Sequence, residues 1–320
     1  MCKRFVMAVF RPWCTALSDL GVRQNHPQPA LEVVATLSEL RTRVSGWRLA
    51  GERIAFVPTM GNLHAGHFAL VERARTQSDR VVASVFVNPT QFGPNEDFAR
   101  YPRTPAADEA GLRASGCDLL FRPDVEVMYP FGLDRVVRVA VPGLSSVLCG
   151  AHRPGHFDGV ATVVLRLLCM VQPDIAIFGR KDLQQLQLIH YLATDFALPV
   201  RIDAGPTTRE ADGLAMSSRN QFLTAEQRPL AARIRQCLGE MLAAAAAGNV
   251  AQAIEAAAMV GLRDAGFDPD YAALRFEDRL DESLWGPILP AQQPRLVALI
   301  AARLGSTRLI DNVAMSELHV

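Results

Sequence analysis

The sequence predicts an α/β fold, in which a parallel sheet with helices is followed by a smaller α+β lid. Short apolar and β-branched runs alternate with helical patterns between residues 30 and 203, and this alternation favours right-handed crossovers between parallel strands. After residue 220 the pattern changes to two long helical segments and three strand-like runs. The chain has 320 residues, about twice the length of a typical domain. We therefore expect two domains.

The elements of the first domain are predicted from periodicity and flanking residues. Apolar spacing predicts a helix at 31–43, and a leading proline favours one at 105–115. A single apolar face, which includes Phe157 and Val164, predicts a helix at 157–171. Further helical patterns lie at 68–75 and 183–196. Short apolar runs predict strands at 53–58, 81–87, 119–121, 136–141, 175–178 and 200–203.

The second domain is expected to begin with a long helix. Thr224 and Gln227 have the spacing of a capping box, which predicts a helix that runs to about residue 247. A further helix is expected at 250–265, followed by strands at 271–276, 296–302 and 307–313. We therefore predict a poorly ordered extension at 1–26 and domains at 27–207 and 208–320.

Composition and charge narrow the class of protein. The chain has 33 basic and 33 acidic residues, and such a neutral chain disfavours nucleic acid or an acidic membrane as its main partner. No apolar run approaches the roughly 18 residues that a membrane-spanning helix needs. The 6 cysteines are scattered along the sequence without a Cys-x-x-Cys pair, and this pattern fits reduced thiols better than disulfides or a zinc site. We therefore expect a cytoplasmic protein that binds neither nucleic acid nor membrane.

The first chemically informative segment, residues 57–68, joins a predicted strand to a predicted helix. His64 and His67 lie three residues apart, so both rings can share one side of the first helical turn. The free amides and positive dipole of that turn suit phosphate, and Gly61 and Gly66 allow a ligand close to the backbone. Alternatively, the histidines are an accidental surface pair or half of a metal site.

The second segment, residues 84–93, ends a β-branched strand with amide side chains. Asn88 and Gln91 follow the carboxyl end of this strand, where ligand crevices of open α/β sheets form. The alternative is that Asn88 only makes the turn with the proline after it.

The third segment, residues 178–185, also runs from a strand end through a glycine into a helix. Only two of the 33 basic residues are lysines, Lys3 and Lys181, and an isolated lysine here suggests a need for a compact ammonium that reaches a phosphate. Gln185 can face the same crevice. The alternative for Arg180, Lys181 and Asp182 is a solvated charge cluster.

The fourth segment, residues 212–220, offers hydroxyl and guanidinium donors. Ser217 and Ser218 are followed by Arg219, and this combination suits a polyphosphate. The alternative is a polar loop between domains.

Other nucleotide and hydrolase signatures are missing from the sequence. We find no Gly-x-Gly-x-x-Gly, no phosphate loop with its lysine, no Gly-x-Ser-x-Gly and no His-Glu-x-x-His. His152 and His156 are four residues apart, but Pro154 and Gly155 break the helix that a metal face would require. The sequence therefore favours nucleotide binding by other means.

Together these segments resemble the pantothenate synthetases, or pantoate–β-alanine ligases, of the nucleotidyltransferase superfamily with the His-x-Gly-His motif. The resemblance covers residues 30–317. It rests on six motifs in the same order and spacing: PTMGNLHAGH, VFVNPTQF, YPRT, RPGHFDGV, FGRKDLQQ and DGLAMSSRN.

The resemblance implies an activity, partners and an architecture. The family joins D-pantoate to β-alanine with ATP and Mg²⁺ through a pantoyl-adenylate, and releases AMP and pyrophosphate. It implies a Rossmann-like ATP- and pantoate-binding domain with a C-terminal lid, and a homodimer. Because the pantoate carboxylate is already ionised at pH 7, adenylation needs no base. We expect positive charge from His64, His67, Lys181, Arg219 and Mg²⁺ to stabilise the departing pyrophosphate.

The resemblance also implies residue roles. The four residues just named would be catalytic. The ATP site would comprise Met60, Gly61, Asn62, Leu63, His64, Ala65, Gly66, His67, Gly179, Arg180, Lys181, Asp182, Thr208, Met216, Ser217, Ser218 and Arg219. Gln91 and Gln185 would hold pantoate. The same cleft would be lined by Asn88, Tyr101, Arg153 and His156.

Several positions depart from the family pattern. Arg180 stands where glutamate is common, and Cys149 also replaces a frequent glutamate. Acidic residues often follow the YPRT motif, but here only Asp108 remains as a candidate magnesium contact. Two other hypotheses stay open: a different nucleotidyltransferase, including a tRNA-charging enzyme, and a pseudoenzyme that binds ATP but has lost its chemistry through Arg180 and Cys149.

Overall fold

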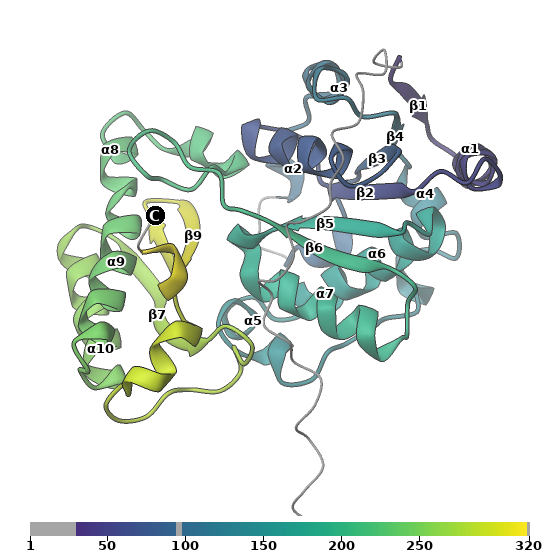
Figure 1. The fold of residues 1–320 in the computed structure, drawn as a ribbon. Helices are drawn as coiled ribbons and strands as arrows, with labels where there is room; N and C mark the ends of the chain where they lie inside the picture. The colour runs from purple at the N-terminus through teal and green to yellow at the C-terminus, as the bar shows by residue number, and fades with distance from the viewer. Residues whose placement is uncertain (1–29, 94–97, 319–320) are drawn as a thin grey trace, which may run out of the picture.

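The computed structural model describes residues 30–93 and 98–318, and its largest element is a parallel sheet of 6 strands. The strands lie in the order β1-β4-β3-β2-β5-β6, and every neighbouring pair is parallel. Figure 1 shows this sheet on one side of the molecule, with helices above and below it. The strands are β1 (Glu32–Val34), β2 (Ile54–Thr59), β3 (Arg80–Val85), β4 (Leu119–Phe121), β5 (Ile175–Gly179) and β6 (Arg201–Gly205).

Alternating side chains of the central strands pack into two separate hydrophobic cores. In β2, Ile54 and Phe56 face the core that contains residues of α1, α6 and α7, whereas Ala55 and Val57 face the core with residues of α2 and α3. This alternation is what a strand covered on both faces requires. The helices are α1 (Leu37–Leu49), α2 (Ala65–Arg75), α3 (Pro105–Ala114), α6 (His156–Val171) and α7 (Leu183–Asp195), with short α4 (Val125–Met128) and α5 (Cys149–His152).

A second sheet, antiparallel and of 3 strands, forms the other side of the molecule. It contains β7 (Asp268–Phe276), β8 (Leu296–Leu304) and β9 (Thr307–Ala314). Helices α9 (Arg233–Ala246) and α10 (Ala251–Asp264) share a buried apolar core with this sheet. We call residues 30–205 the first lobe and residues 224–318 the second lobe, and residues 206–223 the linking segment. The predicted α/β class with a smaller C-terminal α+β unit is confirmed.

The structure corrects two predicted elements of the first lobe. Residues 31–43 are not one helix, because β1 pairs with β4 and α1 begins only at Leu37. Thr36 and Glu39 form a capping box that starts this helix. The strand expected at 136–141 is absent from the described sheet. In that stretch the Val139 amide instead donates to Thr162 Oγ1 of α6.

The long helix expected from Thr224 to residue 247 is divided. The predicted capping box is present, because the Thr224 amide donates to Gln227 Oε1 and the Gln227 amide donates to Thr224 Oγ1. However, α8 (Gln227–Ala231) ends before α9 begins at Arg233. At the break the Arg235 amide donates to the Ala232 carbonyl, three residues back, which is the tighter 3₁₀ bond.

Other predictions concern the ends of the chain and its domains. The boundary near residue 207 stays a prediction, although the first sheet ends at Gly205. The extension predicted at 1–26 lies outside the described residues. Within the part of the chain that the structure describes, no helix combines the length and apolar character that crossing a membrane requires.

Candidate active site

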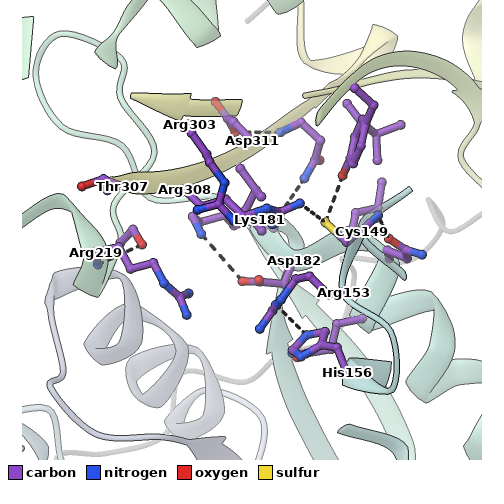
Figure 2. Close-up of a pocket in the computed structure, with 18 of the residues that line it drawn as sticks. Cys149, Arg153, His156, Lys181, Asp182, Arg219, Arg303, Thr307, Arg308 and Asp311 are labelled. Atoms are coloured by element: carbon purple, nitrogen blue, oxygen red, sulfur yellow. Dashed lines mark hydrogen bonds and ion pairs between the residues drawn. The ribbon is translucent and has the colours of Figure 1, made fainter. Parts of the chain in front are cut away.

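A cleft between the two lobes brings together residues from distant parts of the sequence. It has a volume of about 370 Å³ and is lined by the start of α7, by α5 and α6, by the linking segment and by β8 and β9. Figure 2 shows Lys181 and Asp182 in its middle, Arg219 at one side, and Arg153 with His156 below them. Three of the four segments that the sequence singled out therefore contribute to it or contact a residue that does.

The first segment forms the start of α2, and its two histidines fold back onto the backbone. His64 is the N-cap, and its Nδ1 accepts a hydrogen bond from the Gly66 amide at 3.2 Å. His67 Nδ1 accepts one from the His64 amide at 3.3 Å. A ring nitrogen that accepts carries no proton, so in each ring the proton lies on Nε2. The ring centroids are 4.1 Å apart, which presents two N–H donors side by side.

Both imidazoles are neutral near pH 7. Burial lowers the pKa of His64 to about 4, and the Lys181 ammonium acts in the same direction. Burial lowers the pKa of His67 to about 3, with a further contribution from His64. We expected these histidines to supply positive charge. The structure instead makes them neutral hydrogen-bond donors. Neither histidine is among the residues that line the cleft, whose positive charges include Lys181 and Arg219.

The loop before α2 is held by a buried carboxylate. Asp108 in α3 is 3% exposed, and it accepts hydrogen bonds from the Asn62 amide at 3.0 Å, the Leu63 amide at 2.8 Å and Thr104 Oγ1 at 2.9 Å. Gly61 has a φ of +86°, and a Cβ there would lie 3.2 Å from the same carboxylate. These contacts give Asp108 a structural role. They do not support the predicted magnesium contact, because the chain already uses both of its oxygens.

The linking segment connects this loop to the cleft. It ends in a 3₁₀ turn, η6 (Ser218–Phe222), which Ser217 caps by accepting a hydrogen bond from the Arg219 amide at 3.2 Å. Ser218 Oγ donates to the Asn62 carbonyl at 3.0 Å. This bond joins the first and fourth segments, and Ser217 and Arg219 line the cleft itself.

The third segment places the lysine in the cleft. β5 ends at Gly179, and the 3₁₀ turn η5 (Arg180–Asp182) leads into α7. Asn312 of β9 donates to the carbonyl oxygens of Arg180 at 3.0 Å and Lys181 at 2.8 Å. Lys181 Nζ lies 4.0 Å from Asp182 Oδ2. Since that separation is loose for an ion pair, the ammonium can also serve an anion bound in the cleft.

Arg180 is not among the residues that line the cleft, so its place in the ATP site stays a prediction that this geometry does not support. Its Nη1 lies 2.7 Å from Glu277 Oε1 and its Nε lies 3.1 Å from Glu317 Oε1, and both acids belong to the second lobe. These acids raise the pKa of Arg180, although burial opposes them. The reversed charge at this position is therefore neutralised by the second lobe and is not presented to a phosphate.

In the second segment, the buried amide of Asn88 positions the amide of Gln91. Asn88 is fully buried, and its Nδ2 donates to the Gly159 carbonyl and to Gln91 Oε1, both at 3.2 Å. Its Oδ1 accepts from Tyr129 at 2.7 Å. Asn88 therefore holds Gln91 in place and does not line the cleft as expected. Gln91 Nε2 in turn contacts Met60 Sδ, which connects the second segment with the first.

Two predicted substrate residues reach the cleft from the start of α6. His156 Nδ1 lies 2.8 Å from the Gln91 carbonyl, and its Nε2 lies 2.9 Å from Arg153 Nη1. Arg153, His156 and Gln185 line the cleft. Tyr101 is instead 6% exposed and packs its ring edge against Phe92 at 5.8 Å.

The remaining predicted ATP residues belong to the backbone frame of the first and fourth segments. Met216 donates its amide to the Thr208 carbonyl at 3.0 Å, which closes a small antiparallel turn. Ala65 begins α2 directly after His64. A Cβ at Gly66 would lie 3.0 Å from the His64 ring and 3.6 Å from Thr208, so glycine is needed for this close approach.

The second lobe contributes cleft residues that the sequence reasoning missed. They are Tyr271, Leu299, Arg303, Ser306, Thr307, Arg308, Ile310, Asp311 and Asn312. Cys149 contacts two of them, since its Sγ lies 3.1 Å from the Tyr271 hydroxyl and 3.4 Å from Arg308 Nη2. Burial raises the pKa of Tyr271 well above its usual value. The sequence analysis assigned these stretches only to strands, at 271–276, 296–302 and 307–313.

Comparisons with known proteins agree over most of the chain. The model of the family described as Pantoate-beta-alanine ligase matches residues 32–314. A pantothenate synthetase of Xanthomonas campestris pv. campestris (strain B100) is 58% identical over 283 residues, 88% of this chain and 99% of that protein. The pantothenate synthetase of Xylella fastidiosa (strain 9a5c) is 55% identical over 283 residues, with shares of 88% and 99%.

Solved structures agree as well. The crystal structure of pantothenate synthetase from Thermus thermophilus has a TM-score of 0.80 and 44% identity, covering 89% of this chain and 99% of that one. A pantoate-beta-alanine ligase from Francisella tularensis, crystallised with beta-gamma ATP and beta-alanine, has a TM-score of 0.75 and 31% identity, covering 90% and 98%.

Proposed function

Since the chain belongs to the pantoate–β-alanine ligase family, we propose that its cleft forms pantothenate in two steps, through a pantoyl-adenylate. In the first step a pantoate carboxylate oxygen bonds to the α-phosphorus of ATP, and the bond to the bridging oxygen breaks to release pyrophosphate. In the second step the β-alanine nitrogen bonds to the acyl carbon. AMP then leaves with the carbon–oxygen bond pair, and the amine loses its proton.

One observation carries the assignment of the triphosphate site. The hydrogen bond from Ser218 Oγ to the Asn62 carbonyl joins the helix start that carries His64 and His67 to the turn that carries Arg219. Lys181 acts on the pKa of both histidines, so the third segment lies at the same place. Two neutral N–H donors, an ammonium and a guanidinium around one crevice suit a polyphosphate.

In this proposal the two kinds of donor have different tasks. Lys181 and Arg219 attract the tetraanionic nucleotide and oppose the charge that develops on departing pyrophosphate. His64 and His67 donate from Nε2 to phosphate oxygens in fixed directions, because the backbone already orients each ring. No base is required, since the attacking carboxylate is ionised at pH 7.

Pantoate would lie beyond the α-phosphate, against the amides. Gln91 is fixed by Asn88 and Met60, and Gln185 lines the cleft from α7. Two oriented amides can recognise the hydroxyl groups of pantoate. Arg153 and His156, at the start of α6, are assigned to the carboxylate substrates because they pair with each other at the cleft floor.

Magnesium is proposed as a companion of ATP. Among the described residues, no group of three or more histidine, cysteine or acidic side chains could hold a metal ion. The acids that line the cleft are Asp182 and Asp311, and Arg209 already pairs with Asp311 at 2.7 Å. This donor set fits an ion that is bound mainly by phosphate oxygens and water, as Mg²⁺ commonly is. When bound, it would neutralise phosphate charge.

The homodimer is proposed from the family resemblance, and the cytoplasmic location from the composition and the scattered cysteines. Sedimentation equilibrium of the full chain at micromolar concentration would test the dimer. A single species with the mass of one chain would contradict it.

The proposed chemistry is tested by omitting each substrate in turn. We expect AMP release only when ATP, pantoate and β-alanine are all present. Exchange of labelled pyrophosphate into ATP should require pantoate but not β-alanine, and should be indifferent to tRNA. Exchange driven by an amino acid would indicate a different nucleotidyltransferase. Nucleotide binding without AMP release would indicate a protein that has lost its chemistry.

A further inference from the structure

The contact between Arg153 and His156 extends to the backbone of the second segment. His156 Nδ1 lies 2.8 Å from the Gln91 carbonyl oxygen, and His156 Nε2 lies 2.9 Å from Arg153 Nη1. Figure 2 shows the Arg153 guanidinium joined to the His156 ring, below Lys181 and Asp182. A chain of hydrogen bonds therefore runs from a backbone carbonyl, through an imidazole, to a guanidinium that lines the cleft.

The two contacts assign the proton of the His156 ring. A carbonyl oxygen can only accept a hydrogen bond, so Nδ1 carries the proton. A guanidinium can only donate, so Nε2 accepts and carries none. His156 is therefore a neutral imidazole with its proton on Nδ1. This is the opposite tautomer from His64 and His67, whose Nδ1 atoms accept hydrogen bonds from backbone amides.

The backbone on both sides of the first contact is packed closely. His156 is the first residue of α6, and its ring packs edge-on against Phe157, with the ring centroids 5.0 Å apart. The first turn of α6 lies against the 3₁₀ turn η1 (Pro89–Gln91), and a Cβ at Gly159 would lie only 2.7 Å from Gln91 Cα. Glycine is needed for this approach. The Gln91 carbonyl and the His156 ring are therefore held at a fixed separation.

The imidazole restrains a side chain that otherwise has many rotamers. An arginine loses conformational freedom when it binds a ligand, and this loss weakens binding. Because His156 already holds Arg153 Nη1, part of this freedom is lost when the protein folds. The side chain of Gln91, which we assign to pantoate, is itself fixed by Asn88 and Met60. Residue 91 therefore places a substrate amide through its side chain and Arg153 through its carbonyl.

We propose that His156 is a positioning residue for the reaction, which acts through Arg153. As the Nδ1–H tautomer it transmits the position of the Gln91 carbonyl to the guanidinium, and so sets the direction from which Arg153 meets a substrate carboxylate. The inference rests on the proposed function, which assigns both residues to the carboxylate substrates, and it divides their tasks. A neutral imidazole suits this task because it donates on one side of a rigid ring and accepts on the other.

The first test is spectroscopic and does not depend on activity. In the full chain labelled with ¹⁵N-histidine, two-bond ¹H–¹⁵N correlations distinguish a ring protonated on Nδ1 from one protonated on Nε2. At about pH 7.5 the signals that disappear in the His156→Asn variant should belong to a neutral ring with its proton on Nδ1. A proton on Nε2 of His156, alone or in an imidazolium, would overturn the inference.

The second test is a double-mutant cycle on steady-state kinetics. His156→Asn retains a donor near the Gln91 carbonyl but offers no acceptor at the distance of Nε2. Of the KM values for pantoate and β-alanine, it should raise the one that Arg153→Ala raises most, by about tenfold, the low end for a lost hydrogen bond to a charged group. The kcat should stay within about threefold, because the lost contact serves binding. His156→Gln can return an acceptor to Arg153 and should recover part of the affinity.

The cycle also shows whether His156 acts through Arg153. In the Arg153→Ala background, His156→Asn should change the KM by less than about twofold, since residues that act through one contact are not additive. Additive effects would overturn the inference, as would wild-type KM values in His156→Asn. Unchanged KM values in Arg153→Ala would overturn it together with the proposed role of Arg153.

A matched control separates these effects from a general loss of histidine. His152 belongs to α5, lies 3.9 Å from Asp270 Oδ1 through its Nδ1, and does not line the cleft. His152→Asn should therefore keep wild-type KM values. If thermal unfolding shows that His156→Asn has lost its fold, His156→Gln takes its place in both tests. Failure of the unaltered chain to release AMP would instead contradict the proposed function, while the tautomer of His156 could still be measured.

Discussion

Replacing His67 tests whether the start of α2 acts on phosphate through a neutral donor. The ring performs two separable tasks. Its Nδ1 accepts the His64 amide at 3.3 Å, which satisfies a backbone donor at the helix start, and its Nε2 carries the proton that we assign to a phosphate oxygen. His67→Ala removes both. Asparagine can retain the acceptor near the backbone, and glutamine can return an N–H donor at the distance of Nε2.

The structure gives a different magnitude for each task. Loss of the backbone acceptor resembles loss of a helix cap and should cost about 1 kcal/mol of unfolding free energy, or about 2–4 °C in Tm for a chain of this size. Loss of a preorganised donor to a developing charge costs about 3 kcal/mol of transition-state stabilisation. That value corresponds to a decrease of about 100-fold in the rate of adenylate formation.

Single-turnover formation of pantoyl-adenylate, measured by rapid quench, distinguishes these tasks. We expect His67→Ala and His67→Asn to be slowed about 100-fold, and His67→Gln to recover a substantial part of the rate. Because the pKa of His67 is lowered to about 3, wild-type rates should not follow an imidazole titration between about pH 6 and 8. Wild-type turnover in His67→Ala would refute the assignment. Equal rates in the asparagine and glutamine variants would refute the role of the Nε2 donor.

Three further predictions follow from the same contacts. Lys181→Met should lower the rate of adenylate formation by about 100-fold or more, and Lys181→Arg should recover little of it, which rapid-quench measurement can check. Arg180→Ala should cost about 1 kcal/mol in urea unfolding through its lost ion pairs while leaving the KM for ATP within about twofold; a tenfold rise would return Arg180 to the ATP site. Since the pKa values of His64 and His67 are lowered to about 4 and about 3, the unfolded chain takes up protons first. The free energy of unfolding should therefore be constant above about pH 7.5 and fall as the pH drops through the unfolded pKa of about 6.5 towards the folded values, by on the order of 2 kcal/mol per histidine at about pH 5. Urea titrations at about pH 7.5 and at about pH 5 should show a smaller fall in the free energy of unfolding for the His64→Asn/His67→Asn variant than for the unaltered chain.

The fold of the first lobe was largely predictable because its elements are local and strongly patterned. β4 was predicted at its observed bounds, and α6, α7 and β5 were predicted to within one residue at each end. The main error was the helix assigned to 31–43. Val33 and Val34 extend because they pair with β4, which lies far along the chain. The capping box of Thr36 and Glu39 was a local signal that could have placed the helix start correctly.

The identity of site segments was easier to predict than the direction of their side chains. The ends of parallel strands meet at one edge of a sheet, so polar residues just after β2, β3 and β5 were expected to converge. Sequence cannot tell whether such a residue faces a ligand or the backbone. Asn88 and Asp108 have suitable chemistry, but both are consumed by hydrogen bonds inside the protein. The direction of Arg180 was hidden for the same reason, since its partner Glu277 lies 97 residues away in sequence.

The second lobe does more than cover the cleft, because its side chains form hydrogen bonds with groups of the first lobe. Asn312 of β9 holds the two carbonyls of the turn that presents Lys181, and Arg209 of the linking segment pairs with Asp311 beside it. The position of the ammonium is thus set jointly by β5 and by a strand that lies more than 100 residues further along the chain. A change in the relative position of the lobes must therefore move Lys181, or break these bonds. If Lys181 binds phosphate as we propose, this coupling makes the strength of that binding depend on the relative position of the lobes, and a closed position would also keep water from a reactive acyl-adenylate.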